Sequence, residues 1–123
     1  MNIFRKIYTE ITDFIFKKQE IKYNNDSVVR ISELVTNSVI PSNPCDNETF
    51  NRIIADLESI TVACLSTKLK TNSDEFSYHY AKKTLDDIEN WLRYLCVIYK
   101  QKKTELEVLT NFINLLDLTK RLI

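Results

Sequence analysis

Residues 74–103 read DEFSYHYAKKTLDDIENWLRYLCVIYKQKK and contain neither glycine nor proline. Counting in sevens from Tyr78 places an apolar or aromatic side chain at every core position: Tyr78, Ala81, Leu85, Ile88, Leu92, Leu95 and Tyr99. Side chains three and four residues apart share one face of a helix, so this stretch is predicted to form an amphipathic helix of about eight turns. Trp91 and Ile98 widen the stripe, which is typical of a helix that packs against more than one neighbour.

The composition favours an all-α fold in a single domain over residues 1–123. The chain contains no glycine. Hairpin turns and β-bulges rely on glycine for positive φ angles, whereas loops between helices can be built with Asn, Asp, Ser and Pro. The same absence excludes glycine-rich phosphate loops, and with them the common nucleotide-binding motifs.

The chain is expected to form a bundle of about five helices, mostly antiparallel. The periodic segments are residues 2–22, 27–39, about 47–70, 74–103 and 104–122. Pro41 and Pro44 mark the clearest break, and Asp46 is the predicted N-cap of the helix that follows. Residues 27–39 are rich in β-branched side chains, so a strand is the alternative there.

A break near Lys102–Lys103 is predicted from length. A single helix from Asp74 to Leu122 would be about 73 Å long, whereas a compact domain of this size is about 35 Å across. Thr104 and Glu107 match a capping box that would start a new helix. The alternative is one long helix that forms a homodimer.

Residues suited to catalysis or metal binding are few. His79 is the only histidine, whereas metal sites in helical bundles need several ligands at matched spacing. Cys45, Cys64 and Cys96 form no CxxC motif and are predicted to be free thiols in a reducing compartment. We therefore expect no enzymatic activity, no metal and no cofactor. No apolar run approaches the ~20 residues of a membrane span, and the expected location is the cytoplasm.

The aromatic content points to protein binding. Six Tyr, six Phe and one Trp are many for a small bundle, and Tyr and Trp are enriched in protein interfaces. We expect a non-enzymatic domain that binds a partner protein, with inhibitors of the immunity or antitoxin type and effectors as the favoured classes. The expected contact residues are Tyr80, Asp86, Asp87 and Tyr94. Carboxylates on residues 46–58 and 74–89 would form an acidic strip if these helices are neighbours, which suits a basic partner.

Two alternatives remain open. One is an assembly adaptor or a homodimeric structural protein. The other is a small nucleic-acid-binding protein that uses a basic turn with an aromatic residue, formed by Tyr99, Lys100, Lys102 and Lys103. Against the second, 17 basic and 17 acidic residues leave no net charge, and the helix dipole alone favours lysines in a last turn.

Overall fold

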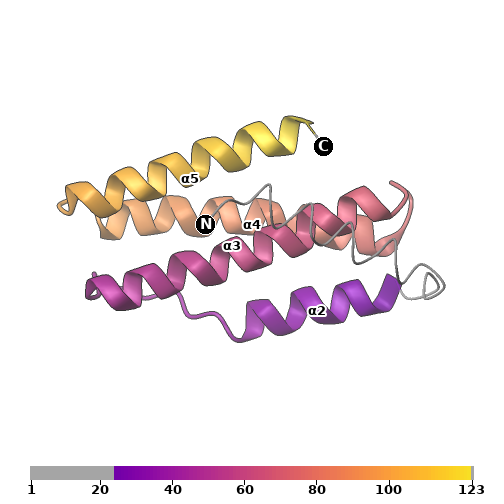
Figure 1. Cartoon of the computed structure of the whole chain (residues 1–123), viewed down its shortest axis with the longest axis horizontal. Coiled ribbons are helices and arrows are strands. Elements are labelled where there is room, and N and C mark those ends of the chain that lie inside the picture. Colours follow the sequence, from indigo (N-terminus) through magenta and orange to yellow (C-terminus); the bar gives the residue numbers. More distant parts are fainter. Residues whose placement is uncertain (1–23, 123) are drawn as a thin grey trace.

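The computed structural model describes residues 24–122, and within this range every element is a helix. The four helices are α2 (Asn24–Thr36), α3 (Asn47–Lys70), α4 (Phe76–Ile98) and α5 (Lys103–Leu122) (Figure 1). The all-α prediction is confirmed for these residues. Four helices pack together here instead of five, and the helix predicted over residues 2–22 lies outside the described residues.

Helix α4 is the central element of the bundle. It packs most extensively on α3 and also contacts α5 and α2, whereas α5 packs mainly on α4. Figure 1 shows α4 running between α5 and α3. The turns at residues 71–75 and 99–102 are short, so consecutive helices lie antiparallel.

The seven-residue stripe of α4 forms the centre of the core. Six of its members have no exposed surface: Ala81, Leu85, Ile88, Leu92, Leu95 and Tyr99. Tyr78, at the start of the stripe, is half-buried. Trp91 and Ile98 pack partly buried against the core, as their flanking positions predict.

One stretch in the second half of α3 is buried on every side, although Leu69 after it is 46% exposed. All residues from Thr61 to Lys68 are buried, including polar ones. The hydroxyls of Thr61 and Thr67 donate to carbonyl oxygens one turn earlier, at 2.7 and 2.8 Å, which satisfies them within the helix. The Lys68 ammonium lies 5.4 Å from the centroid of the Tyr78 ring, so a cation–π contact replaces part of its hydration.

Helix α2 confirms the helical prediction and excludes the strand, but its limits differ from the predicted 27–39. It ends at Thr36, and Val39 is exposed instead of buried. The Ser38 hydroxyl donates to the Leu34 carbonyl at 2.9 Å, which satisfies an acceptor that the Ser38 amide would have used in a longer helix. Pro41 also disfavours a helical conformation at the residue before it.

The predicted break between α4 and α5 is confirmed, and the continuous helix is excluded. Helix α4 ends at Ile98, the amide of Lys102 donates to the Tyr99 carbonyl at 2.8 Å, and α5 begins at Lys103. The predicted capping box is wrong, because Thr104 lies inside α5. The first helical hydrogen bond runs from the Leu106 amide to the Lys102 carbonyl.

Tyr99 ties the loop before α3 to the end of α4. The Cys45 amide donates to the Tyr99 hydroxyl at 2.8 Å, and the Tyr99 ring lies 5.0 Å from that of Phe50. Asp46 is the N-cap of α3, as predicted, and accepts a hydrogen bond from the Thr49 amide at 2.8 Å. Hydrogen bonds from the side chain and the backbone of Thr49 lower the pKa of the Asp46 carboxyl.

Candidate protein-binding surface on α4

One side of α4 is lined with aromatic rings. Five residues, separated by four, seven, four and three positions, fall within one sector of the helix, and we call them the aromatic face: Phe76, Tyr80, Asp87, Trp91 and Tyr94. Phe76 is 69% exposed and Tyr94 is 47% exposed. The remaining three are half-buried. The face therefore combines large rings in water with rings held by the core.

Packing holds two of these rings in place. Tyr80 and Trp91 both contact the hydrophobic core while keeping part of their surface exposed. The rings of Phe76 and Tyr80 lie 6.0 Å apart with a 40° angle between their planes. Asp87 accepts from the Lys83 ammonium at 3.1 Å, one turn away on the same helix. Lys83 is largely exposed, so this ion pair is weak and Asp87 can exchange it for another donor.

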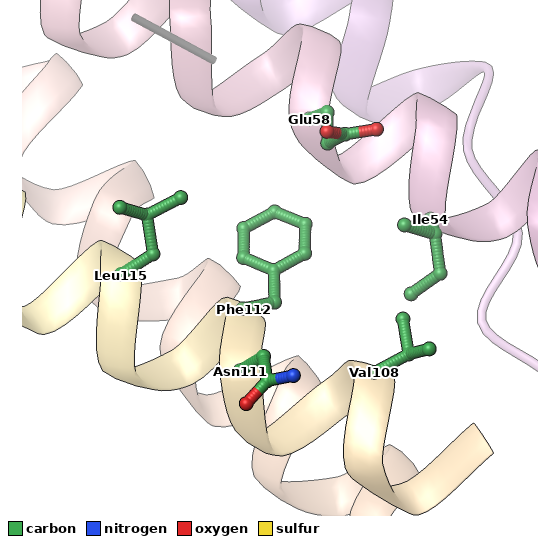
Figure 2. Close-up of a pocket in the computed structure, with 6 residues that line it drawn as sticks. All are labelled: Ile54, Glu58, Val108, Asn111, Phe112 and Leu115. Atoms are coloured by element: carbon green, nitrogen blue, oxygen red, sulfur yellow. The ribbon is translucent and has the colours of Figure 1, made fainter. Parts of the chain in front are cut away.

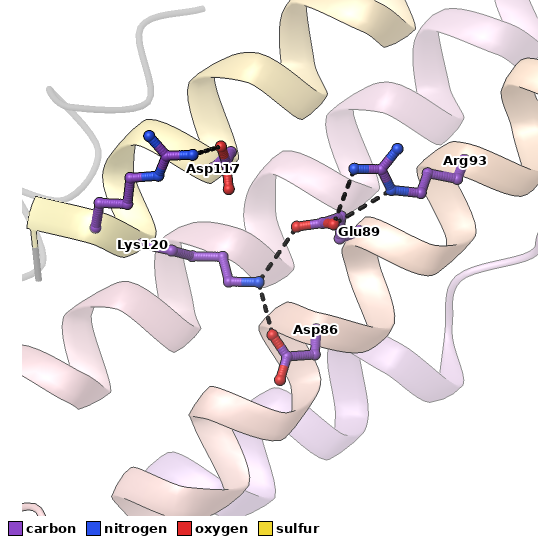
Figure 3. A network of polar contacts seen from close by, with 6 residues as sticks. Asp86, Glu89, Arg93, Asp117 and Lys120 are labelled. Atoms are coloured by element: carbon purple, nitrogen blue, oxygen red, sulfur yellow. Dashed lines mark hydrogen bonds and ion pairs between the residues drawn. The ribbon is translucent and has the colours of Figure 1, made fainter.

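The side of α4 that faces α5 carries charges instead. The Lys120 ammonium of α5 lies 2.6 Å from an Asp86 carboxylate oxygen and 3.3 Å from one of Glu89 (Figure 3). The Arg93 guanidinium donates to the other Glu89 oxygen at 3.1 and 3.2 Å. We call Asp86, Glu89, Arg93 and Lys120 the polar clamp. It joins α5 to α4 near the end of the chain.

The pKa values in the polar clamp shift in opposite directions. Burial alone would raise the pKa of Glu89, but hydrogen bonds from Arg93 and Lys120 outweigh it and lower the pKa. Burial alone would lower the pKa of Lys120, but hydrogen bonds to Asp86 and Glu89 outweigh it and raise the pKa. Both groups are thus held in their charged forms.

The structure brings together three of the four predicted contact residues. Tyr80, Asp87 and Tyr94 lie on the aromatic face, whereas Asp86 points toward α5 and binds Lys120. Consecutive residues on a helix differ by about 100° in direction, which separates the two aspartates. Phe76 is the exposed ring of this face that the sequence reasoning missed, and its helical spacing from Tyr80 and Tyr94 was the signal available.

Part of the predicted acidic strip is paired within this chain. Helices α3 and α4 are neighbours, as the prediction required. However, Asp86 and Glu89 are paired with Lys120, Asp87 is paired with Lys83, and Asp46 caps α3. Two carboxylates of α4, Asp86 and Glu89, therefore bind α5, and fewer are left for a basic partner.

The basic turn retains its lysines but loses its aromatic residue. Lys100, Lys102 and Lys103 are exposed, whereas Tyr99 is fully buried. The Tyr99 ring packs against Phe50 and its hydroxyl accepts from the Cys45 amide. Because base stacking needs an accessible ring face, Tyr99 cannot supply it.

The three thiols are each half-buried or buried. Burial raises the pKa of the Cys64 thiol. Burial also raises the pKa of Cys96, although the charge of Arg93 and a hydrogen bond with Thr110 lower it in part. Within residues 24–122, no cluster of three His, Cys, Asp or Glu side chains could hold a metal ion.

None of the four described helices combines the length and the apolar character needed to cross a bilayer.

Two hollows open on the surface of the described helices. A groove of about 180 Å³ between α3 and α5 is lined by Ile54, Glu58, Val108, Asn111, Phe112 and Leu115 (Figure 2). A larger hollow of about 430 Å³ lies beside the α2–α3 loop, where Arg52 and Asp56 share the wall with Cys45 and apolar side chains. Among the described residues that line them, neither hollow places a histidine beside Cys45 or a second carboxylate beside the first, so neither offers a nucleophile–base or acid–base pair.

Comparisons with known proteins assign no family to this arrangement. The chain matches no protein family, no curated protein and no solved structure. The geometry of α4 and its neighbours is therefore the basis for the proposed function.

Proposed function

We propose that the chain is a non-enzymatic protein-binding domain that docks on its partner through the aromatic face of α4. The observation that carries this proposal is the exposure of Phe76 and Tyr94, at 69% and 47%, on one stripe with two further aromatic rings. Large rings in water are unfavourable, and a partner surface that covers them would recover that free energy.

The packing of Tyr80 and Trp91 supports a docking role. Because the core already restrains both rings, little side-chain entropy would be lost when a partner covers their exposed edges. Rings of this kind are the residues that dominate binding energies at protein interfaces. Asp87, between them, would offer a carboxylate to a hydrogen-bond donor of the partner.

This surface suits proteins that act by covering another protein. Inhibitors of the immunity or antitoxin type and effectors work in this way, and an assembly adaptor is the alternative. The two classes differ in outcome, since an inhibitor lowers its partner's activity and an adaptor does not. Because most carboxylates of α4 are already paired, binding is expected to depend on the rings and to be only weakly sensitive to salt.

Affinity capture from native lysate tests the proposal, with Tyr94→Ala as the variant and Leu69→Ala as its control. Leu69 is 46% exposed, close to the exposure of Tyr94, but it lies on α3 and outside the aromatic face. The wild type and Leu69→Ala should each retain one stoichiometric protein, and Tyr94→Ala should retain at least about tenfold less. Equal capture by Tyr94→Ala, or recovery of RNA in place of a protein, would contradict the proposal.

A further inference from the structure

Helix α5 carries a second apolar stripe, away from the side that packs on α4. Counting in sevens from Val108 gives one polar and four apolar residues, which we call the outer stripe: Val108, Asn111, Leu115, Leu118 and Leu122. Leu118 is 52% exposed and Leu122 is 72% exposed. In contrast, Leu109 and Leu116 on the α4 side are fully buried. The helix is thus apolar on two sides, and only one of them is covered by α4.

The outer stripe forms one wall of the groove between α3 and α5. Val108, Asn111 and Leu115 belong to both, and Ile54 and Glu58 of α3 form the opposite wall (Figure 2). At about 180 Å³, the groove is smaller than the ~300 Å³ at which ligand pockets begin. Its length along α5 instead suits the side chains of another helix lying beside it.

We propose that α5 pairs with the α5 of a second copy of this chain, antiparallel, through the outer stripe. Apolar residues at alternating spacings of three and four are the pattern by which two helices interdigitate along a seam. The one polar residue in the seam, Asn111, faces Leu115 of the second copy in this arrangement and lowers the stability of the pair.

The charges beside the stripe decide the orientation. Glu107 and Arg121 both occupy the position immediately before an apolar residue of the stripe, fourteen residues apart. With the twofold axis between Ile113 and Asn114, Val108 faces Leu118 of the second copy, and Glu107 lies within one helical turn of Arg121 of the second copy. The symmetry repeats this contact, so two ion pairs flank the seam. In a parallel pair, Glu107 would instead lie beside Phe112 of the second copy, and neither charge would gain a partner.

The contacts that Arg121 makes within the chain leave it able to bridge. Its guanidinium lies 2.9 Å from the Asp117 carboxylate, one turn away, and the Arg121 side chain remains largely exposed. A surface pair of this kind contributes little, so a second carboxylate can share the same cation. A seam of about two heptads is smaller than a standard stable interface, so the dissociation constant is expected on the order of tens of micromolar.

Sedimentation velocity over protein concentrations from about 1 to 500 µM tests the pairing. The wild type should pass from monomer to dimer across this range. Glu107→Arg and Arg121→Glu should each weaken the dimer about tenfold or more, because both ion pairs become repulsive. The double swap should restore wild-type association, since it re-creates the pairs with reversed polarity.

Leu118→Glu and Val29→Glu provide a matched pair of apolar substitutions. Both residues are 52% exposed, but Val29 lies on α2. Leu118→Glu should abolish the dimer and Val29→Glu should leave it intact, while far-UV circular dichroism shows that each variant keeps its helix content. A wild type that stays monomeric throughout overturns the proposal and leaves the stripe to another part of the chain or to another protein. A dimer that ignores the charge reversals, or that the double swap fails to restore, overturns it as well.

Discussion

The two sides of α4 carry different kinds of side chain, and the buried stripe of the helix lies between them. On the side facing α5, Asp86 and Glu89 bind Lys120, and Glu89 also binds Arg93. On the aromatic face, Phe76 and Tyr94 expose large rings. The comparison teaches that the charges on one side of this helix are paired with α5, whereas the large rings on the other side remain exposed.

The spacing along the two helices explains why the charged side is internally satisfied. Asp86 and Glu89 are three residues apart, so they lie one above the other on α4 and one ammonium can reach both. Lys120 comes from α5, more than thirty residues later, and its side chain is only 23% exposed. No comparable partner reaches Phe76 or Tyr94 from the described helices.

The largest expected effect concerns the buried stripe of α4, which lies between its two sides. Leu92→Ala removes three carbons at a fully buried position of α4, so the free energy of unfolding should fall by about 3 kcal/mol. Urea unfolding followed by circular dichroism measures the change. Val97→Ala, at an exposed position of the same helix, is the control and should change it by less than about 0.5 kcal/mol. Similar losses for both variants would mean that the stripe is not the core.

Removing the centre of the polar clamp should have a smaller effect. Lys120→Met keeps the length of the side chain but leaves Asp86 without its interhelical partner and Glu89 with Arg93 alone. The free energy of unfolding should fall by about 1 kcal/mol. Lys83→Met removes an exposed pair within one helix and should change it by less than about 0.5 kcal/mol. A larger loss for Lys83→Met than for Lys120→Met would reverse the assigned roles of the two sides.

The smallest effect is a dependence on pH that only the clamp side should show. The pKa of Glu89 is lowered in the folded state, so its stabilisation is present above its ordinary value of 4.5 and is lost as pH falls through the folded pKa. The pKa of Lys120 is raised, so its stabilisation is present below 10.5 and is lost as pH rises through the folded pKa.

The difference in unfolding free energy between wild type and Lys120→Met should therefore be largest between these limits. It should shrink both in acid below about pH 4.5 and in alkali above about pH 10.5. Urea titrations at several pH values measure it, with Tyr94→Ala as the control whose difference from wild type stays constant. A difference that is independent of pH would show that Lys120 acts through packing and not through its charge.

The sequence was sufficient for the parts of the fold that depend on local pattern. The α4 stripe from Ala81 to Tyr99 is periodic, lacks Gly and Pro, and is buried as predicted. The break near Lys102 followed from the length of helix that a compact domain can cover. The capping box predicted at Thr104 was wrong, because this Thr-x-x-Glu pattern lies inside α5. The turn at Tyr99–Lys102 ends α4 before Thr104 is reached.

The division of the charges was beyond sequence reasoning. Asp86 and Asp87 are adjacent and chemically identical, and only the position of α5 decides that one of them binds Lys120. From the sequence, Tyr99 was compatible with a core position and with an exposed ring that stacks on a base. Its burial against Phe50 shows that it is a core residue. Such choices depend on contacts between residues tens of positions apart, which periodicity within one helix does not encode.

The most direct measurement compares Tyr94→Ala with Lys120→Met in the same capture and unfolding experiments. The account predicts a crossed result. Tyr94→Ala should lose the captured protein but keep the wild-type midpoint of urea unfolding, and Lys120→Met should keep the captured protein but unfold at lower urea. Capture that survives Tyr94→Ala, or that is lost in folded Lys120→Met, would contradict the assignment of binding to the aromatic face.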